Sequence, residues 1–409
     1  MRLTTAFNRI LQLPGASVHT VAFTDQGIVI GLRRRRRRLL CRCGATTAAR
    51  YDSSRRLWRH LDFGACRVWL EADIHRIDCR GCGRVRTEQV PWARPNARHT
   101  SDFENMVAWL AQRMDKTSIS RLLRCSWEAV DAIVTRVVAD HIDDSRLEHL
   151  YRVGVGEISY KRGHKFLTIV ADHDTGNVVW VGKQRSKAAF EEFFTALGPG
   201  RAAAIEAISL DGSSVYLPVT REQIPQARIC LDPFHVIKWT NEVVESVYRA
   251  EAPGIPAGPG MPARRDWRRT RFAVRAGREH LNEHHRQILG LLRRHRYKLW
   301  RTWELKEQLR DLYRSTDPAH ARAYLKRWCI SAKRSRIPAY ANLVRRIEKH
   351  FDAIIAAVEL GLSNSRLEGI NAKIRLVQRR GYGFRNLDAL TAAIYLCLGG
   401  ISLKPPTER

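Results

Sequence analysis

The fold is decided by five short apolar segments: RVGVGEISY (152–160), KFLTIVADH (165–173), NVVWVG (177–182), AIEAISLD (204–211) and ARICLD (227–232). Each is rich in β-branched residues and bounded by turn formers, which predicts a strand. Short turns alone separate the first three, so they predict an antiparallel meander. SKAAFEEFFTALG (186–198) has a helical period and ends at a glycine, which predicts a helix before the last two strands.

The order of these elements predicts the fold class. A helical segment between 204–211 and 227–232 predicts parallel pairing of those two strands. Three antiparallel strands, a helix and then strand–helix–strand is the order of a ribonuclease-H-like α/β core. We therefore predict a multi-domain α+β chain built around such a core.

Two cysteine pairs precede this core. Cys41-Arg-Cys43-Gly and Cys79-Arg-Gly-Cys82-Gly flank a strand-rich stretch, and paired cysteines of this kind predict a zinc ribbon that holds structural Zn²⁺ through four thiolates. The first pair is one residue shorter than C-x-x-C, so a metal-free knuckle is the alternative. Cys66 is a candidate substitute ligand.

The period becomes helical between the ribbon and the core. KTSISRLLRCSWEAVDAIVTRVV (116–138) divides into two helices around Arg124-Cys125-Ser126, with Ser126 as N-cap of the second. This pattern predicts a helix-turn-helix whose second helix enters the DNA major groove with Arg124, Ser126, Trp127, Glu128 and Asp131 near its reading end. A plain helical hairpin is the alternative.

The rest of the chain completes the domain prediction. VHTVAFTDQGIVIGL (18–32) alternates and predicts a hairpin, PGIPAGPGMP (253–262) predicts a loop, and the stretch from Trp267 to Gly361 is helical in pattern. The predicted parts are residues 1–98 with the ribbon, 99–148 with the helix-turn-helix, 149–250 as the first part of the core, 251–360 as a large helical insertion, and 361–409 as the C-terminal core helices.

Charge indicates the partner. The chain has 71 Lys and Arg against 41 Asp and Glu, a formal net charge of +30, which favours double-stranded DNA over a merely soluble basic protein. No apolar run approaches the roughly 20 residues of a membrane span, and the N-terminus has no signal pattern, so we expect a cytoplasmic, nucleoid-associated protein. An arginine run, which a solvated surface could equally explain, is predicted to contact phosphates: Arg33, Arg34, Arg35, Arg36, Arg37 and Arg38.

Two acidic residues are candidates for chemistry. Asp211 ends the strand 204–211, and Glu368 lies in SNSRLEGIN (363–371) near the start of a helix. Carboxylates on rigid elements suit Mg²⁺ (or Mn²⁺), which supports phosphodiester cleavage. Structural acids are the alternative at both positions.

The chain resembles the ISL3 family of DDE-type bacterial insertion-sequence transposases over nearly its full length. The segments that carry the resemblance, besides the cysteine pairs, are LPGASVHTVAFTDQGIVI (13–30), VPWARPNARHTSDFE (90–104), AWLAQRMDKT (108–117), GEISYKRGHKFLTIVADHDTG (156–176), AIEAISLD (204–211), ICLDPFHVIK (229–238), LSNSRLEGINAKIRL (362–376) and GYGFRN (381–386).

This resemblance implies binding of terminal inverted repeats, metal-dependent strand cleavage and strand transfer. It implies three metal-binding acids, of which Asp211 matches the second and Glu368 the third. The first is expected immediately before Glu157, where this sequence has Gly156. Glycine contributes no ligand, and Glu157 points to the opposite strand face unless a bulge rotates it inward.

The missing acid predicts impaired cleavage. Asp172 and Asp174 are weaker candidates to replace it, and Asp232 is expected to be structural. The alternative function is a catalytically inactive DNA-binding remnant that occupies transposon ends. Synapsis of two ends makes a homodimer an expectation. Basic residues near Glu368 are predicted to face DNA phosphates: Arg366, Lys373, Arg375, Arg379 and Arg380.

Overall fold

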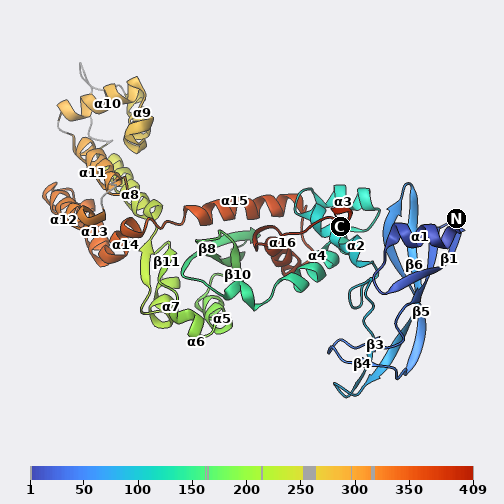
Figure 1. Ribbon diagram of the computed structural model, residues 1–409. Coiled ribbons are helices and arrows are strands. Elements are labelled where there is room, and N and C mark those ends of the chain that lie inside the picture. The colour runs from blue at the N-terminus through green and yellow to red at the C-terminus, as the bar shows by residue number, and fades with distance from the viewer. Residues whose placement is uncertain are drawn as a thin grey trace. The chain divides into compact units, whose positions relative to one another are not determined.

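The computed structural model (Figure 1) describes residues 2–161, 163, 165–212, 215–251, 264–295, 297–314 and 318–408, without the side chains of 264–268 and 318–319. The loop predicted at 253–262 lies outside these residues. The chain forms two compact units, one of residues 1–145 with 373–409 and one of residues 146–372.

The N-terminal part of the first unit is a twisted sheet. After α1 (Leu3–Leu11), its strands are β1 (Ala16–Thr24), β2 (Gly27–Arg34), β5 (Asp52–Phe63), β6 (Cys66–Cys79) and β7 (Arg84–Thr87), in the order β1-β2-β6-β5 with β7 on β6. The hairpin predicted from the alternating residues is present, because β1 and β2 pair antiparallel and Thr24 lies opposite Gly27. A small ribbon of β3 (Leu39–Leu40) and β4 (Thr46–Thr47) lies beside the cysteines.

A helical bundle completes the first unit. It contains α2 (Ser101–Ala111), α3 (Lys116–Leu123), α4 (Trp127–His141) and α16 (Leu387–Leu398), which bury Phe103, Val134 and Leu396 in one core. The Gln112 side chain donates to the carbonyls of Leu396 (2.8 Å) and Ile401 (2.9 Å), which fixes the C-terminal segment to α2. Ala392 and Leu396 of α16 are buried in the same core as residues of α2 and α4.

The second unit contains a mixed five-stranded sheet. Its strands are β8 (Arg152–Lys161), β9 (Lys165–Asp172), β10 (Val178–Lys183), β11 (Ala207–Leu210) and β12 (Arg228–Leu231), in the order β10-β9-β8-β11-β12. The first three pair antiparallel, whereas β11 is parallel to both β8 and β12. All five strands and their directions match the sequence prediction. The connecting helices are α5 (Lys187–Leu197), α6 (Pro199–Ala203) and α7 (Tyr216–Gln223).

A long helical region follows β12. Its helices are α8 (Pro233–Glu251), α9 (Arg264–Arg275), α10 (Glu283–Arg294), α11 (Lys298–Leu312), α12 (Pro318–Arg334), α13 (Pro338–Lys349), α14 (Phe351–Leu360) and α15 (Ser365–Arg380), of which α15 begins in the second unit and ends in the first. Trp303 and Trp328 are buried in the core of this region. Buried Lys306 donates to the carbonyls of Val274, Arg275 and Ala276 at 2.8–3.1 Å, which satisfies the C-terminal end of α9. Within the described part of the chain, no helix combines the length and apolar composition that a membrane crossing requires.

Candidate functional sites

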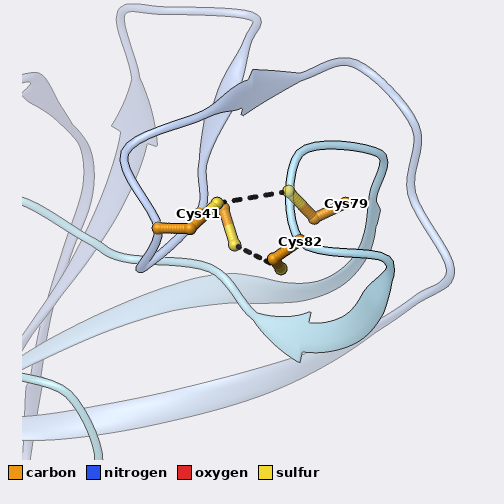
Figure 2. A group of neighbouring side chains, drawn as sticks. Cys41, Cys79 and Cys82 are labelled. Carbon is orange, nitrogen blue, oxygen red and sulfur yellow. Dashed lines mark hydrogen bonds between the residues drawn. The ribbon is translucent and has the colours of Figure 1, made fainter.

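Four cysteine side chains lie close together, two from the segment after β3 and two from the end of β6 and the turn before β7. The sulfur atoms of Cys41, Cys43, Cys79 and Cys82 all lie within 4.8 Å of one another. The sulfur atoms of Cys41 and Cys82 are 3.9 Å apart, and those of Cys43 and Cys79 are 3.6 Å apart. Figure 2 shows the labelled side chains of Cys41, Cys79 and Cys82 turned toward one another. Four thiols at this spacing form the ligand set of a structural zinc site.

The shortened first pair still closes. In it the N–H of Cys41 donates to the Ala45 carbonyl (2.8 Å), and Gly44 turns the chain at φ +90°. In the second pair the N–H of Gly83 donates to the Cys79 carbonyl (2.7 Å). The backbone N–H of Cys82 lowers the pKa of the Cys79 thiol to about 7, which favours the thiolate that zinc binds. Cys66 lies exposed at the start of β6 and is not part of this group, so the substitute ligand is not needed.

Local contacts fix the turn between α3 and α4 of the helix-turn-helix. Ser126 accepts from the Ala129 N–H (3.2 Å), and Arg124 adopts φ +52° to end α3. The Ser120 hydroxyl donates to the Cys125 carbonyl (2.6 Å) and stabilises the turn. Asp131, expected near the reading end of α4, instead pairs with Lys116 at 2.7 Å, and both side chains are largely buried.

Several predicted DNA-contacting arginines are engaged within the protein. Arg34 binds the buried carboxylate of Glu88 and donates to the Asp73 carbonyl (2.7 Å). Arg124 pairs with Asp62. By contrast, Trp127 is 37% exposed, and the exposed members of the arginine run are Arg33, Arg35, Arg36, Arg37 and Arg38.

The predicted acidic site begins at the centre of the second sheet. β11 pairs with β8 in parallel so that Ser209 lies opposite Gly154. Asp211 lies two residues beyond Ser209, just as Gly156 lies two residues beyond Gly154. Gly156, where the resemblance predicts an acid, and Asp211 therefore follow a pair of opposed residues by the same number of positions along the chain.

Helix α15 is attached to β8 on the face of Gly156. The Asn364 amide donates to the Val155 carbonyl and the Asn371 amide to the Glu157 carbonyl, each at 3.2 Å. Leu367 lies between these two contacts and is buried against the glycines. These contacts hold the first turn of α15, which carries the exposed side chain of Glu368.

A buried polar network fixes the start of α15. Asp232 accepts from the Asn364 backbone N–H (3.1 Å), and the Ser209 hydroxyl binds both the Asn364 side chain and His173 Nε2, the latter at 2.7 Å. Burial raises the pKa of Asp232, and the Asn364 N–H partly offsets this shift. These contacts agree with the structural role expected of Asp232. The sequence analysis missed Asn364, although its place just before a helix marks it as a cap candidate.

Glu157 is the first candidate to replace the acid that the resemblance predicts at position 156, and its side chain pairs with another residue. The β8–β9 ladder is regular through Gly156, Glu157 and Ile158, so no bulge turns Glu157 inward. Glu157 pairs with Arg185 at 2.6 Å. Burial raises the pKa of Glu157, Arg185 lowers it, and Asp211 raises it, which indicates that Asp211 is within electrostatic reach.

The two remaining candidate acids serve the β9–β10 turn. Asp172 accepts from the N–H groups of Asp174 (2.9 Å) and Thr175 (3.1 Å), and Asp174 pairs with Arg152. Among the described residues, the cysteine cluster is the single group of three or more Cys, His, Asp or Glu side chains close enough to share a metal ion. No group of this kind within the described residues includes Asp211 or Glu368.

Glu368 borders a cavity of about 480 Å³ within the second unit. Asp232, Phe234 and Tyr313 also line it, and Asp211 is not among its described lining residues. The basic residues near Glu368 differ in environment: Arg366 donates to the His173 carbonyl and Arg380 to the Gln112 carbonyl (3.4 Å), whereas Lys373, Arg375 and Arg379 are exposed.

A cysteine ribbon, a helix-turn-helix and an α/β domain with acidic side chains at its sheet together define a DNA-binding transposase. Comparison with known families agrees for each part. Residues 41–82 match the zinc-finger of transposase IS204/IS1001/IS1096/IS1165, residues 88–138 match the helix-turn-helix domain of transposase family ISL3, and residues 153–394 match the DDE transposase model of ISL3.

The chain belongs to the ISL3 transposase family. It is 39% identical over 403 residues to the transposase for insertion sequence element IS1557 of Mycobacterium tuberculosis, covering 92% of this chain and 90% of that protein. It is also 29% identical over 355 residues to the transposase for insertion sequence element IS1001 of Bordetella parapertussis, covering 86% of each.

Proposed function

We propose that this chain is the transposase of an insertion sequence, binds the terminal inverted repeats through residues 1–140, and descends from enzymes that cleave and transfer DNA strands with Mg²⁺ or Mn²⁺. In this proposal the core is ribonuclease-H-like with a helical insertion, and Asp211 and Glu368 are its metal-binding acids. The strand order β10-β9-β8-β11-β12 supports the core, with Asp211 directly after β11 and Glu368 on the helix attached to β8.

Gly156 limits the chemistry of this copy. A divalent ion bound by carboxylates activates the attacking oxygen and stabilises the leaving oxygen during phosphodiester cleavage. Asp211 and Glu368 offer oxygen ligands, but Gly156 offers none and no neighbouring acid turns toward its place. The donor set is thus incomplete for a two-metal site, and we derive no catalytic step through a metal ion.

The N-terminal parts have separate roles. Structural Zn²⁺ bound by Cys41, Cys43, Cys79 and Cys82 fixes the ribbon, and α4 enters the major groove with Ser126 and Trp127 at its leading end. The exposed arginines of the 33–38 run, with Lys373, Arg375 and Arg379, contact phosphates. A homodimer in the nucleoid would bring two transposon ends together.

The decisive observation is the space at Gly156. A Cβ atom there would lie 3.8 Å from the nearest Leu367 carbons, which is ordinary contact, so a side chain can start from this position without displacing Leu367. The test compares the natural chain with Gly156→Asp on labelled transposon ends in Mg²⁺, Mn²⁺ and EDTA. We expect metal-dependent nicking by Gly156→Asp to exceed that of the natural chain by orders of magnitude, and Glu368→Gln in the same background to abolish it.

The second candidate function is a non-catalytic protein that occupies transposon ends, and Gly156 is the observation that favours it. It predicts that both proteins bind the ends and that the natural chain does not cut. Equal nicking by the two proteins would show that another group supplies the missing ligand. If neither protein binds the ends, both candidate functions fail.

A further inference from the structure

The loop that follows α15 is fixed beside the recognition helix α4. Lys116, which is 6% exposed, donates to the Gly383 carbonyl (3.0 Å) and lies 4.8 Å from the centre of the Phe384 ring. The same ammonium group pairs with Asp131 of α4 at 2.7 Å. A buried cation therefore joins this loop, residues 381–385, to the helix-turn-helix within one unit.

Tyr382 has an unfavourable backbone conformation in this loop. Its φ of +47° lies in the left-handed region, where a bulky residue costs free energy and glycine does not. Its side chain is 66% exposed, so the free energy gained by burying the ring offsets little of this backbone cost. A large side chain held at such a position, with glycines on both sides, points to a role outside the protein core.

The Tyr382 ring extends the exposed surface of α4. It stacks on Trp127, the first residue of α4, with ring centres 6.2 Å apart and planes inclined by 26°. Positive charge accompanies the rings. Arg385 is exposed in the same loop, directly after Phe384, whose ring lies against the Lys116 ammonium group that pairs with Asp131 of α4. After the Glu128 backbone N–H and the Ser126 hydroxyl, the positive charge of Arg385 also lowers the pKa of Glu128.

We propose that Tyr382 and Arg385 form a second DNA-contacting element beside α4, in which the Tyr382 hydroxyl donates to a phosphate oxygen of double-stranded DNA and Arg385 pairs with a neighbouring phosphate. The inference rests on the proposed function in one respect, namely that α4 binds DNA. Arginine and tyrosine side chains are common phosphate donors, and this loop presents both beside the start of α4. A protein surface would offer these donors no comparable row of anions.

Such contacts position the duplex but do not read its sequence. Loss of either contact should therefore weaken specific and non-specific binding by the same factor. The contacts also give the C-terminal segment a function beyond packing, since residues far from α4 in sequence would share its duplex.

The test measures binding of the full chain by fluorescence anisotropy. The probes are a labelled 40-base-pair duplex from the terminus of the insertion sequence that encodes the chain and a scrambled duplex of equal composition. We expect Tyr382→Phe to weaken binding to both duplexes about fivefold to tenfold, since one hydrogen bond to a charged group is lost. Arg385→Gln should reduce the slope of log affinity against log salt by about one.

Two controls separate this role from a structural one. Tyr382→Gly should bind at least as weakly as Tyr382→Phe while its thermal midpoint stays equal or rises, because glycine relieves the backbone cost. Tyr151→Phe removes the hydroxyl of another exposed tyrosine (42%), which lies in the second unit and outside residues 1–140, and should not change binding.

The outcomes are distinct. Unchanged binding by Tyr382→Phe and Arg385→Gln overturns the inference alone, as does a fall in the thermal midpoint of Tyr382→Gly that parallels its loss of binding. Equal losses for Tyr151→Phe and Tyr382→Phe also overturn it. A natural chain that binds neither duplex overturns the proposed function and this inference with it.

Discussion

Leu367 of α15 lies directly over Gly156 of β8, and a Cβ atom at Gly156 would lie 3.8 Å from three of its side-chain carbons. The neighbouring glycine on the same strand face is much more confined. A Cβ atom at Gly154 would lie 2.7 Å from Leu367 Cδ1, 2.9 Å from His173 Nε2 and 3.1 Å from Ser209 Oγ. The two glycines thus differ in kind: Gly154 permits the close approach of α15, whereas Gly156 leaves space for a side chain.

The two glycines should respond differently to alanine. We expect Gly154→Ala to lower the free energy of unfolding by about 1–3 kcal/mol, because the methyl group overpacks a closed site. Gly156→Ala should be neutral or slightly stabilising, because a strand interior prefers a side chain. Urea denaturation of both variants measures the difference. Equal destabilisation would contradict the packing described for α15.

Asn364 should be essential for the start of α15. Its side chain bonds to the Val155 carbonyl and the Ser209 hydroxyl, so Asn364→Ala leaves buried polar groups without partners. We expect a loss of about 2–4 kcal/mol in the free energy of unfolding. The matched control is Ser365→Ala at the exposed adjacent position, where a change within about 0.5 kcal/mol is expected. Comparable losses in the two variants would show that the network contributes little.

Cys43 should be required for metal binding despite the shortened first pair. Its sulfur belongs to the group of four, whereas Cys66 lies outside it. We expect about one Zn²⁺ per chain in the natural protein and in Cys66→Ser, and a large loss of bound zinc in Cys43→Ser, because a structural zinc site uses four protein ligands. Atomic absorption after dialysis against a weak chelator provides the measurement. Zinc retained by Cys43→Ser but lost by Cys66→Ser would reverse the assignment.

Asp232 should make stability depend on pH. Burial raises its pKa in the folded chain above the value of the unfolded chain, so the folded state binds more protons in the interval between them. Its stabilising contribution is therefore fully present below the unfolded value and is lost as pH rises through the folded value.

Asp232→Asn tests this dependence. The amide oxygen can still accept from the Asn364 N–H, but it carries no charge to bury. We expect the stability of Asp232→Asn relative to the natural chain to increase as pH rises from about 4, in thermal denaturation scans across pH 3–7. A constant difference across that range would show that the ionisation of Asp232 is not linked to folding.

The local features of this protein follow from its sequence. The alternation of apolar residues and the turn residues between them predicted β8, β9 and β10, and the short apolar segments before Asp211 and Asp232 predicted β11 and β12. Cysteine spacing predicted the ribbon, and Ser126 was correctly predicted as the cap of α4. The resemblance to the family also indicates that Gly156 stands where a metal-binding acid is expected.

Other features depend on contacts between residues far apart in the chain. Arg34 forms an ion pair with Glu88, so this arginine of the predicted phosphate-binding run is engaged within the protein. Asn364 joins β8, β11 and the start of α8 to α15. Periodicity predicts which face of a helix is apolar, but it does not identify the element against which that face packs.

The sequence alone therefore determined the elements, the cysteine ligands and the family, because these depend on residue type and local spacing. Only the tertiary structure decided that residues after Lys373 complete the helix-turn-helix bundle, and that Tyr382 stacks on Trp127. Both facts arise from the packing of segments that are more than 200 residues apart, and local propensity carries no information about such pairings.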